Sequence, residues 1–309
     1  MRGLAPAAFA AAVSLGVAPA WAQPDIDRMV RAGRALAQEG RFAEAETIFR
    51  QALKAKPRQL DCLIALGVAL DMQGQYAEAR TQFEAAAQVA PQGPPRVSAL
   101  WAQAVSFAFE RRAADAERVL ETARAQQKAD GDYAGAAASA RLIGRIYLES
   151  GLVESGRRWY ELGYQESRPP PGASAEDTAL WRMRSAHAQA RLAAREGNAD
   201  AARRHLEEFE TLMRQRGKPG DDNDIYRFVA GYVAYYAKDY DRAIAEFSRG
   251  HIGDTFIVAM LGASYEAKGD AVAARRYYER ALEITAHNVQ TAIGRPMARE
   301  RLAALGPTR

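Results

Sequence analysis

The stretch that decides the fold is IDRMVRAGRALAQEGRFAEAETIFRQALKAKP, residues 26–57, because residues 60–91, LDCLIALGVALDMQGQYAEARTQFEAAAQVAP, repeat its pattern. Small and large residues return in the same order with a constant shift of 34 positions, so that Gly33, for example, returns as Gly67. A fixed period of this length is typical of proteins built from stacked helical repeats.

Each copy predicts two helices that pack closely together. A glycine on the first helix lets the second helix approach, a phenylalanine on the second helix fills the space between them, and alanines keep the crossing helices close. The anchor residues of the two copies are Gly33, Ala45, Phe49 and Pro57, followed by Gly67, Ala79, Phe83 and Pro91. This pattern resembles the tetratricopeptide repeat, a helix-turn-helix unit. The resemblance implies a protein that holds a partner.

Five further helix pairs follow the template less faithfully. The third pair has Ala104 where the first two have glycine, and the fifth pair is the weakest, with Ala190 there. Better anchors stand in the fourth, sixth and seventh pairs, namely Gly144, then Gly231 and Phe247, then Gly262, Ala274 and Tyr278. The expected fold class is all-α, an α-solenoid of about seven tetratricopeptide-like helix-turn-helix units with a C-terminal capping helix.

A run of three prolines between Ser167 and Gly172 interrupts the repeats, because successive prolines cannot continue a helix. Gly294 and Pro296 disfavour helix near the end of the chain, so the capping helix is expected to start only near Arg295. The expected division is a four-unit N-terminal array at 23–167, a proline-rich linker at 168–177, a three-unit C-terminal array at 178–287, and a capping helix with a tail at 288–309.

The first 22 residues read as a cleaved signal peptide. Arg2 precedes an uncharged, alanine-rich run, and small residues flank a cleavage site near Ala22–Gln23. No later stretch is apolar over the length that a membrane-spanning helix needs. The mature protein is therefore expected in the periplasm, or secreted, with no membrane span.

Net charge and cysteine content each limit what the protein can do. The formal net charge of +4 is small for 309 residues and gives no reason to expect a nucleic-acid partner. Cys62 is the only cysteine, so no internal disulfide can form. Its position between leucines predicts a small buried apolar side chain.

The usual signatures of catalysis and of cofactor binding are missing. The histidines are scattered, so a zinc site has no obvious ligands, and there is neither a phosphate-binding Gly-rich loop nor a Gly-x-Ser-x-Gly motif. No cofactor, metal or enzymatic activity is therefore expected, with a composite-site enzyme as the less favoured alternative. The four histidines are His187, His205, His251 and His287.

The resemblance implies that the first helices line a concave groove, and it assigns groove positions residue by residue. The middle of this groove is cationic and is followed by an aromatic wall. The candidate partner-binding residues are Arg141, Arg145, Arg184, His187, Arg191, Arg195, Phe228, Tyr232, Tyr235 and Tyr236. Further groove positions are Asp61, Asp71, Trp101, Phe109, Glu149, Phe256 and Glu266. Arginine suits carboxylate or phosphate, and tyrosine offers rigid contact area.

Two interpretations of these residues remain open. Arginines at intervals of seven and four also occur on any solvated helix face, and the tyrosines could instead pack between units. The favoured function is a periplasmic scaffold that binds a protein or peptide through its concave surface without chemistry. The alternative is a binder of an anionic cell-envelope polymer or small ligand through the central arginine and tyrosine groove.

Overall fold

The computed structural model describes residues 25–217 and 223–306, and in these residues it contains fifteen α-helices and no strand. The expected signal peptide, residues 1–22, and its cleavage site lie outside the described residues. None of the described helices is long and apolar enough to cross a membrane.

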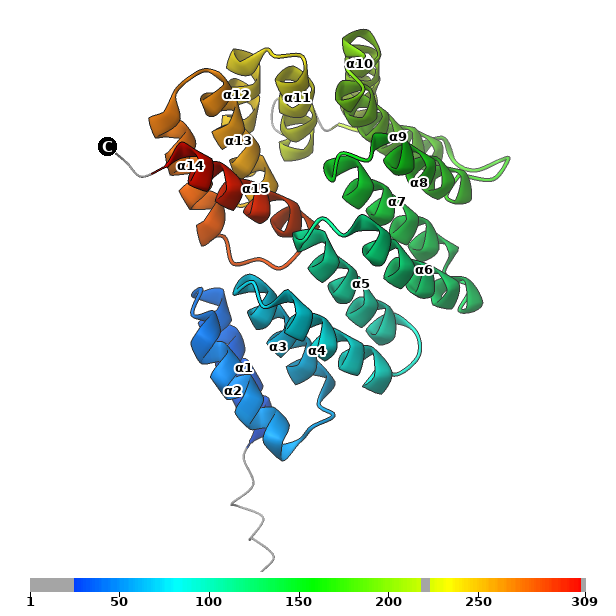
Figure 1. Ribbon diagram of the computed structural model, residues 1–309. Helices are drawn as coiled ribbons and strands as arrows, with labels where there is room; N and C mark the ends of the chain where they lie inside the picture. Colours follow the sequence, from blue (N-terminus) through cyan, green and yellow to red (C-terminus); the bar gives the residue numbers. More distant parts are fainter. Residues whose placement is uncertain (1–24, 218–222, 307–309) are drawn as a thin grey trace, which may run out of the picture.

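The first fourteen helices form seven successive helix-turn-helix pairs that follow a curved path (Figure 1). The last helix, α15, lies between the final pairs and α5 (Figure 1). The helices are α1 (Ile26–Gln38), α2 (Phe42–Ala55), α3 (Leu60–Met72), α4 (Tyr76–Val89), α5 (Pro94–Phe109), α6 (Ala113–Ala129), α7 (Tyr133–Glu149), α8 (Val153–Glu166), α9 (Ala175–Arg195), α10 (Ala199–Gln215), α11 (Asp224–Tyr236), α12 (Tyr240–Arg249), α13 (Thr255–Ala267), α14 (Ala271–Glu283) and α15 (Val289–Leu305). The all-α solenoid fold expected from the sequence is confirmed.

Glycine and aromatic anchors meet inside the helix pairs. A Cβ atom added to Gly67 would lie 2.6 Å from the ring of Phe83, and one added to Gly33 would lie 2.5 Å from the ring of Phe49. The later pairs repeat the arrangement, with separations of 2.7 Å for Gly231 and Phe247 and 2.8 Å for Gly262 and Tyr278. Each glycine therefore leaves the space into which the aromatic ring of its partner helix fits.

Cys62 is fully buried, as its sequence position predicts. Its thiol lies 3.4 Å from the backbone carbonyl of Phe49. Burial raises the pKa of this thiol to about 11, so the group remains protonated at neutral pH and behaves as a small apolar side chain.

The start of α15 differs from the sequence expectation. The helix begins at Val289 instead of near Arg295, and Pro296 lies inside it. The side chain of Asn288 caps the first turn by accepting a hydrogen bond from the Thr291 amide at 2.9 Å. Gly294 contributes through its size, since a Cβ there would lie 2.7 Å from a backbone oxygen of α13. Capping and close packing therefore offset the hydrogen bond that the proline removes.

Helix α15 packs against α13 and α14, where it covers the last pair, and it also contacts α5 and α7 (Figure 1). In an open solenoid each repeat touches only its neighbours. Here the C-terminal helix connects the end of the array with its first half.

Candidate functional site

Three of the candidate residues converge on one carboxylate at the centre of the array, and a fourth bonds to one of these three. Glu149, at the end of α7, forms an ion pair with Arg191 and a longer one, 3.4 Å, with Arg195, both from α9. The hydroxyl of Tyr232, on α11, donates to the same carboxylate at 3.1 Å, and Tyr236 accepts from Arg195 at 3.0 Å. The side chain of Glu149 is only 2% exposed. The contacts of this cluster therefore connect the fourth, fifth and sixth helix pairs.

Burial decides between the two open interpretations of Arg191. Arg191 is 1% exposed, so it does not belong to a solvated helix face, and that interpretation is wrong for this residue. Its guanidinium lies 5.4 Å from the ring centre of Phe228 and 5.3 Å from that of Tyr232, which is itself fully buried. These three side chains therefore present no surface to a partner in this structure, and they act as core.

Arg145 and His187 lie beside the cluster. The Nε atom of Arg145 is buried and has no hydrogen-bond partner among the described residues. Burial and then the nearby charge of Arg191 lower the pKa of Arg145. Burial, Arg191 and Arg145 together lower the pKa of His187 to about 3, and its ring packs 5.7 Å from that of Phe209. His187 is thus a neutral packing residue at neutral pH.

The aromatic wall is covered by the C-terminal helix. Tyr235 and Tyr236 line a small cavity of about 120 Å3, and Ile293 and Met297 of α15 line it too. Burial raises the pKa of Tyr236 to about 12, so its hydroxyl stays protonated. The expected wall therefore exists, but the chain itself occupies the space in front of it.

An open cleft remains where the proline-rich segment joins α8 to α9. This cleft, called the α7–α9 cleft below, has a volume of about 550 Å3. Arg141 of α7 and Arg184 of α9 line it, together with Trp181 and the loop from Arg168 to Ala173. Arg184 is exposed and has no ion pair within the described ranges. Among the candidate arginines, Arg184 is the exposed one, and Arg141 beside it is half-buried.

The floor of the α7–α9 cleft is rigidly held. Arg141 donates to the hydroxyl of Ser167 at 3.1 Å, and its guanidinium lies 5.6 Å from the ring centre of Tyr164. The indole of Trp181 donates to the backbone carbonyl of Tyr164 at 3.0 Å. Burial and the neighbouring charge of Arg184 lower the pKa of Arg141. Arg141 therefore stands over a fixed aromatic ring, with the charge of Arg184 near it.

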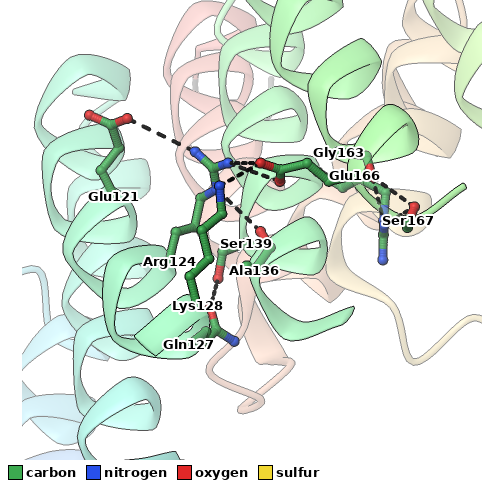
Figure 2. A network of polar contacts seen from close by, with 10 residues as sticks. Glu121, Arg124, Gln127, Lys128, Ala136, Ser139, Gly163, Glu166 and Ser167 are labelled. Atoms are coloured by element: carbon green, nitrogen blue, oxygen red, sulfur yellow. Dashed lines mark hydrogen bonds and ion pairs between the residues drawn. The ribbon is translucent and has the colours of Figure 1, made fainter. Parts of the chain in front are cut away.

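One of the two carboxylates that line the cleft, Glu166, is already paired. Glu166 accepts hydrogen bonds from Arg124 at 2.8 Å and from Lys128 at 2.7 Å, both on α6 (Figure 2). Burial alone would raise the pKa of Glu166, but the hydrogen bonds from Lys128 and Arg124 outweigh it and lower the pKa. Glu166 is held from the side of α6, and Asp177 also lines the cleft. Neither carboxylate forms an ion pair with Arg141 or Arg184 among the described residues.

Sequence reasoning missed three contributors to this cleft. Trp181, Tyr164 and Arg168 line it, yet none stands at a groove position that the resemblance assigns. A signal was present for Trp181, which lies three residues before Arg184 and therefore on the same helical face. Tyr164 belongs to a second helix and Arg168 to the loop, so a rule about first helices cannot find them. Within the described chain, no group of three or more histidine, cysteine or acidic residues is placed to hold a metal ion.

Three segments of the chain match a known repeat family. Family models described as tetratricopeptide repeat match residues 36–104, 183–208 and 257–288. The middle match falls on α9 and α10, the pair whose anchors are weakest. A search of the curated proteins found no match.

Solved structures share the fold at low sequence identity. A tetratricopeptide repeat protein from Parabacteroides merdae is 14% identical with a TM-score of 0.52, covering 91% of this chain and 99% of that one. A Rap protein complexed with competence and sporulation factor is 12% identical with a TM-score of 0.54, covering 91% and 76%. The Rap conjugation gene regulator of plasmid pLS20, in complex with the Phr* peptide, is 14% identical with a TM-score of 0.50, covering 91% and 75%.

Proposed function

Because the chain is a tetratricopeptide repeat protein, we propose that it is a non-catalytic scaffold that binds an acidic peptide segment of a partner protein. The α7–α9 cleft is the binding site in this proposal. Stacked helix pairs hold such a surface in shape before the partner arrives, so that little ordering entropy is lost on binding.

The observation that carries the proposal is a pair of arginines in an open cleft that form no ion pair among the described residues. Arg184 is exposed without an ion pair among the described residues, and Arg141 stands beside it over the Tyr164 ring. Guanidinium groups bind carboxylates through charge-assisted hydrogen bonds, and they accept both oxygens of the group at once. Trp181 adds an apolar surface for the neighbouring side chains of a peptide.

The central cluster does not offer a comparable site. Arg191 and Arg195 already share the carboxylate of Glu149, and Tyr232 donates to it as well. A ligand would have to displace these bonds and enter a buried region. The open cleft requires neither change.

Two of the similar structures were solved with a bound peptide or factor, the two Rap proteins. This supports the idea that a solenoid of this shape accommodates a peptide, although those proteins share only 14% and 12% of their residues with this chain. The site in this proposal is argued from the cleft itself.

The proposed compartment is the periplasm of a Gram-negative bacterium, or the exterior of the cell. The support is the sequence of residues 1–22, with Arg2, an apolar run and a small-residue cleavage site near Ala22–Gln23. N-terminal sequencing of the protein isolated from its native host tests this part: a mature chain starting at Gln23 is expected, and a chain that still starts at Met1 would overturn it.

The binding site is tested by affinity capture from a cell-envelope extract with three versions of residues 23–309. They are the wild type, the double variant Arg141→Ala with Arg184→Ala, and the control variant Arg182→Ala. Arg182 is also exposed and lies on α9, but it pairs with Glu208 and does not line the cleft. A protein retained by the wild type and the control, and lost by the double variant, is the expected result.

The captured protein is then reduced to its acidic segments as synthetic peptides, and their affinity is measured by fluorescence anisotropy. Loss of two charge-assisted contacts should weaken binding by about tenfold to a hundredfold. Retention of an anionic polymer in place of any protein, with affinity that falls steeply as salt rises, would instead support the polymer-binding alternative. Equal retention of a partner by all three versions would remove the cleft from the binding surface.

A further inference from the structure

The segment Ile284–Asn288, which connects α14 to α15, leaves the last helix pair and crosses to the first ones. Figure 1 shows the loop between α14 and α15 extending toward the N-terminal helices. The Thr285 hydroxyl donates to the backbone carbonyl of Gln38, at the end of α1, at 3.3 Å. Thr285 and Ala286 also line a pocket together with apolar side chains of the first two pairs. An extended piece of the chain therefore lies on the inner face of the first pairs, as a bound peptide would.

His287 is the most deeply inserted side chain of this segment. Its Nε2 atom lies 2.8 Å from a carboxylate oxygen of Asp71, on α3, and its side chain is only 8% exposed. The ring lies between two aromatic side chains, 5.7 Å from Phe83 and 5.8 Å from Phe109 by ring centres. The inner face thus has a pocket with aromatic walls and an acidic base, and an imidazole fills it.

The acidic base of the pocket needs a donor. Asp71 is fully buried, and its other carboxylate oxygen accepts a hydrogen bond from the hydroxyl of Ser106 at 2.7 Å. Without His287, that hydroxyl would be the one remaining hydrogen-bond donor to the carboxylate within the described chain. A buried carboxylate with so few partners is costly, so the pocket favours an occupant that supplies an N–H donor or a positive charge.

Further contacts hold the segment and the helix that follows it. Arg295 of α15 donates to the backbone carbonyls of Leu282 and Ile284, at 2.7 and 3.3 Å. Arg299 of α15 donates to the Tyr76 hydroxyl at 3.3 Å, and Arg111 pairs with Glu300 at 2.8 Å. Both members of the second pair are more than half exposed, and exposed pairs of this kind add little stability. A contact to a backbone carbonyl does not depend on the side chain, whereas Asp71 contacts the His287 ring itself, so the pocket of Asp71 is where this region discriminates between occupants.

We propose that the inner face of the first three helix pairs is a second peptide-binding groove, that residues 284–288 fill it as an internal ligand, and that an extended partner segment carrying a histidine displaces them. This groove uses none of the residues of the α7–α9 cleft, so the inference goes beyond the proposed function and does not depend on it. The internal ligand has a high effective concentration because it is tethered, and an external segment competes against that concentration.

The first test uses a fluorescently labelled peptide with the sequence of residues 281–291. Its binding to residues 23–309 is measured for the wild type and for the variant His287→Ala, which empties the pocket but keeps Asp71. The expected result is binding at least about tenfold tighter to the variant, because the tethered competitor has lost its anchor. A second peptide, in which alanine replaces the histidine, should not bind the variant.

Two controls separate this groove from other surfaces. Asp71→Asn combined with His287→Ala should abolish binding of the peptide, whereas Arg184→Ala combined with His287→Ala should bind it as His287→Ala does. Loss of binding in the Arg184→Ala combination would place the peptide in the α7–α9 cleft and overturn the proposal. So would equal affinity for the two peptides, since the pocket would then not recognise the imidazole.

A second measurement needs no substitution, and it decides the matter if His287→Ala does not fold. The NMR resonances of the His287 ring in isotope-labelled wild-type protein are followed with and without an excess of the unlabelled peptide. The ring lies beside Phe83 and Phe109, so a loss of their ring-current shifts is expected when the peptide displaces the segment. Unchanged resonances at peptide concentrations that saturate any binding would overturn the proposal.

Discussion

Glu149 is the residue on which the interior electrostatics of this protein depend. It is one carboxylate that serves two arginines of α9 and a tyrosine of α11, and the sequence gives little indication of this role. From their groove positions, three residues were predicted to form part of a binding surface, namely Arg191, Arg195 and Tyr232. Their common partner reveals instead a buried polar network, which sequence spacing could not distinguish from a solvated face because both have the same helical period.

Removing the charge of Glu149 should destabilise the fold strongly. Glu149→Gln leaves Arg191 buried without its ion pair, and breaking one partner of a buried pair costs about 3–5 kcal/mol. Urea unfolding followed by circular dichroism measures the loss. The matched control is Glu154→Gln on the exposed start of α8, which should change stability by less than about 0.5 kcal/mol. Similar values for the two variants would mean that the network adds nothing to stability.

His187 should make stability depend on pH. Its pKa is about 3 in the folded protein, against about 6.5 in an unfolded chain. Between these values the unfolded chain holds a proton that the folded protein does not, so this residue lowers stability as the pH falls, by up to about 1.4 kcal/mol per pH unit. His187→Gln removes this contribution. The stability lost between about pH 6.5 and pH 5 should then shrink by about 2 kcal/mol, measured by urea unfolding at each pH. A variant with the pH profile of the wild type would contradict a neutral buried imidazole.

At the scale of the helix, the first two helix pairs were predictable from the sequence because local packing determines them. A glycine facing a phenylalanine is a short-range rule, and Gly67 with Phe83 obeys it at 2.6 Å. The start of α15 was not predictable by the same means. Pro296 and Gly294 argue locally against helix, and the tertiary contact between Gly294 and α13 overrides that local preference.

Filling the space at Gly67 should cost stability through the helix pair. In Gly67→Ala the new Cβ meets the Phe83 ring at 2.6 Å, so the ring or the helix must move, at a cost of about 1–3 kcal/mol. Gly250→Ala is the control, since its nearest neighbour lies at 3.4 Å and its φ is −82°. Thermal melts of both variants give the comparison. Adding Phe83→Leu to Gly67→Ala should recover part of the loss, and the absence of any recovery would argue against a direct clash.

At the scale of the whole molecule, the array is closed by its own C-terminal end. The contact of His287 with Asp71 joins positions 216 residues apart, and no repeat period encodes such a separation. Sequence reasoning therefore named Asp71 and Phe109 as groove residues without finding their occupant. Of the residues that line the open cleft, it named only Arg141 and Arg184. The loop of prolines that completes the cleft has no periodic pattern from which its position could be predicted.

Closure should make unfolding cooperative along the whole chain. Deleting residues 284–309 removes the contacts of α15 with α5 and α7. Apart from the hydrogen bond of Tyr232 to Glu149, the contacts that remain are mainly between neighbouring pairs. The single urea transition expected for the full chain should then separate into two, each with a smaller dependence on denaturant. The control lacks only residues 307–309. Tryptophan fluorescence and circular dichroism that still coincide in one transition, with an unchanged slope, would contradict a closed array.

The position of His287 also sets an order of events during synthesis. The first three pairs leave the ribosome well before the imidazole that completes the Asp71 pocket, because His287 follows Asp71 by 216 residues. Contacts between such distant positions form late, because the intervening chain must first be ordered. A nascent or prematurely terminated chain that lacks His287 therefore has an acidic pocket without its imidazole donor, and this distinguishes it chemically from the longer chain. A chain that includes His287 fills the pocket with its own imidazole.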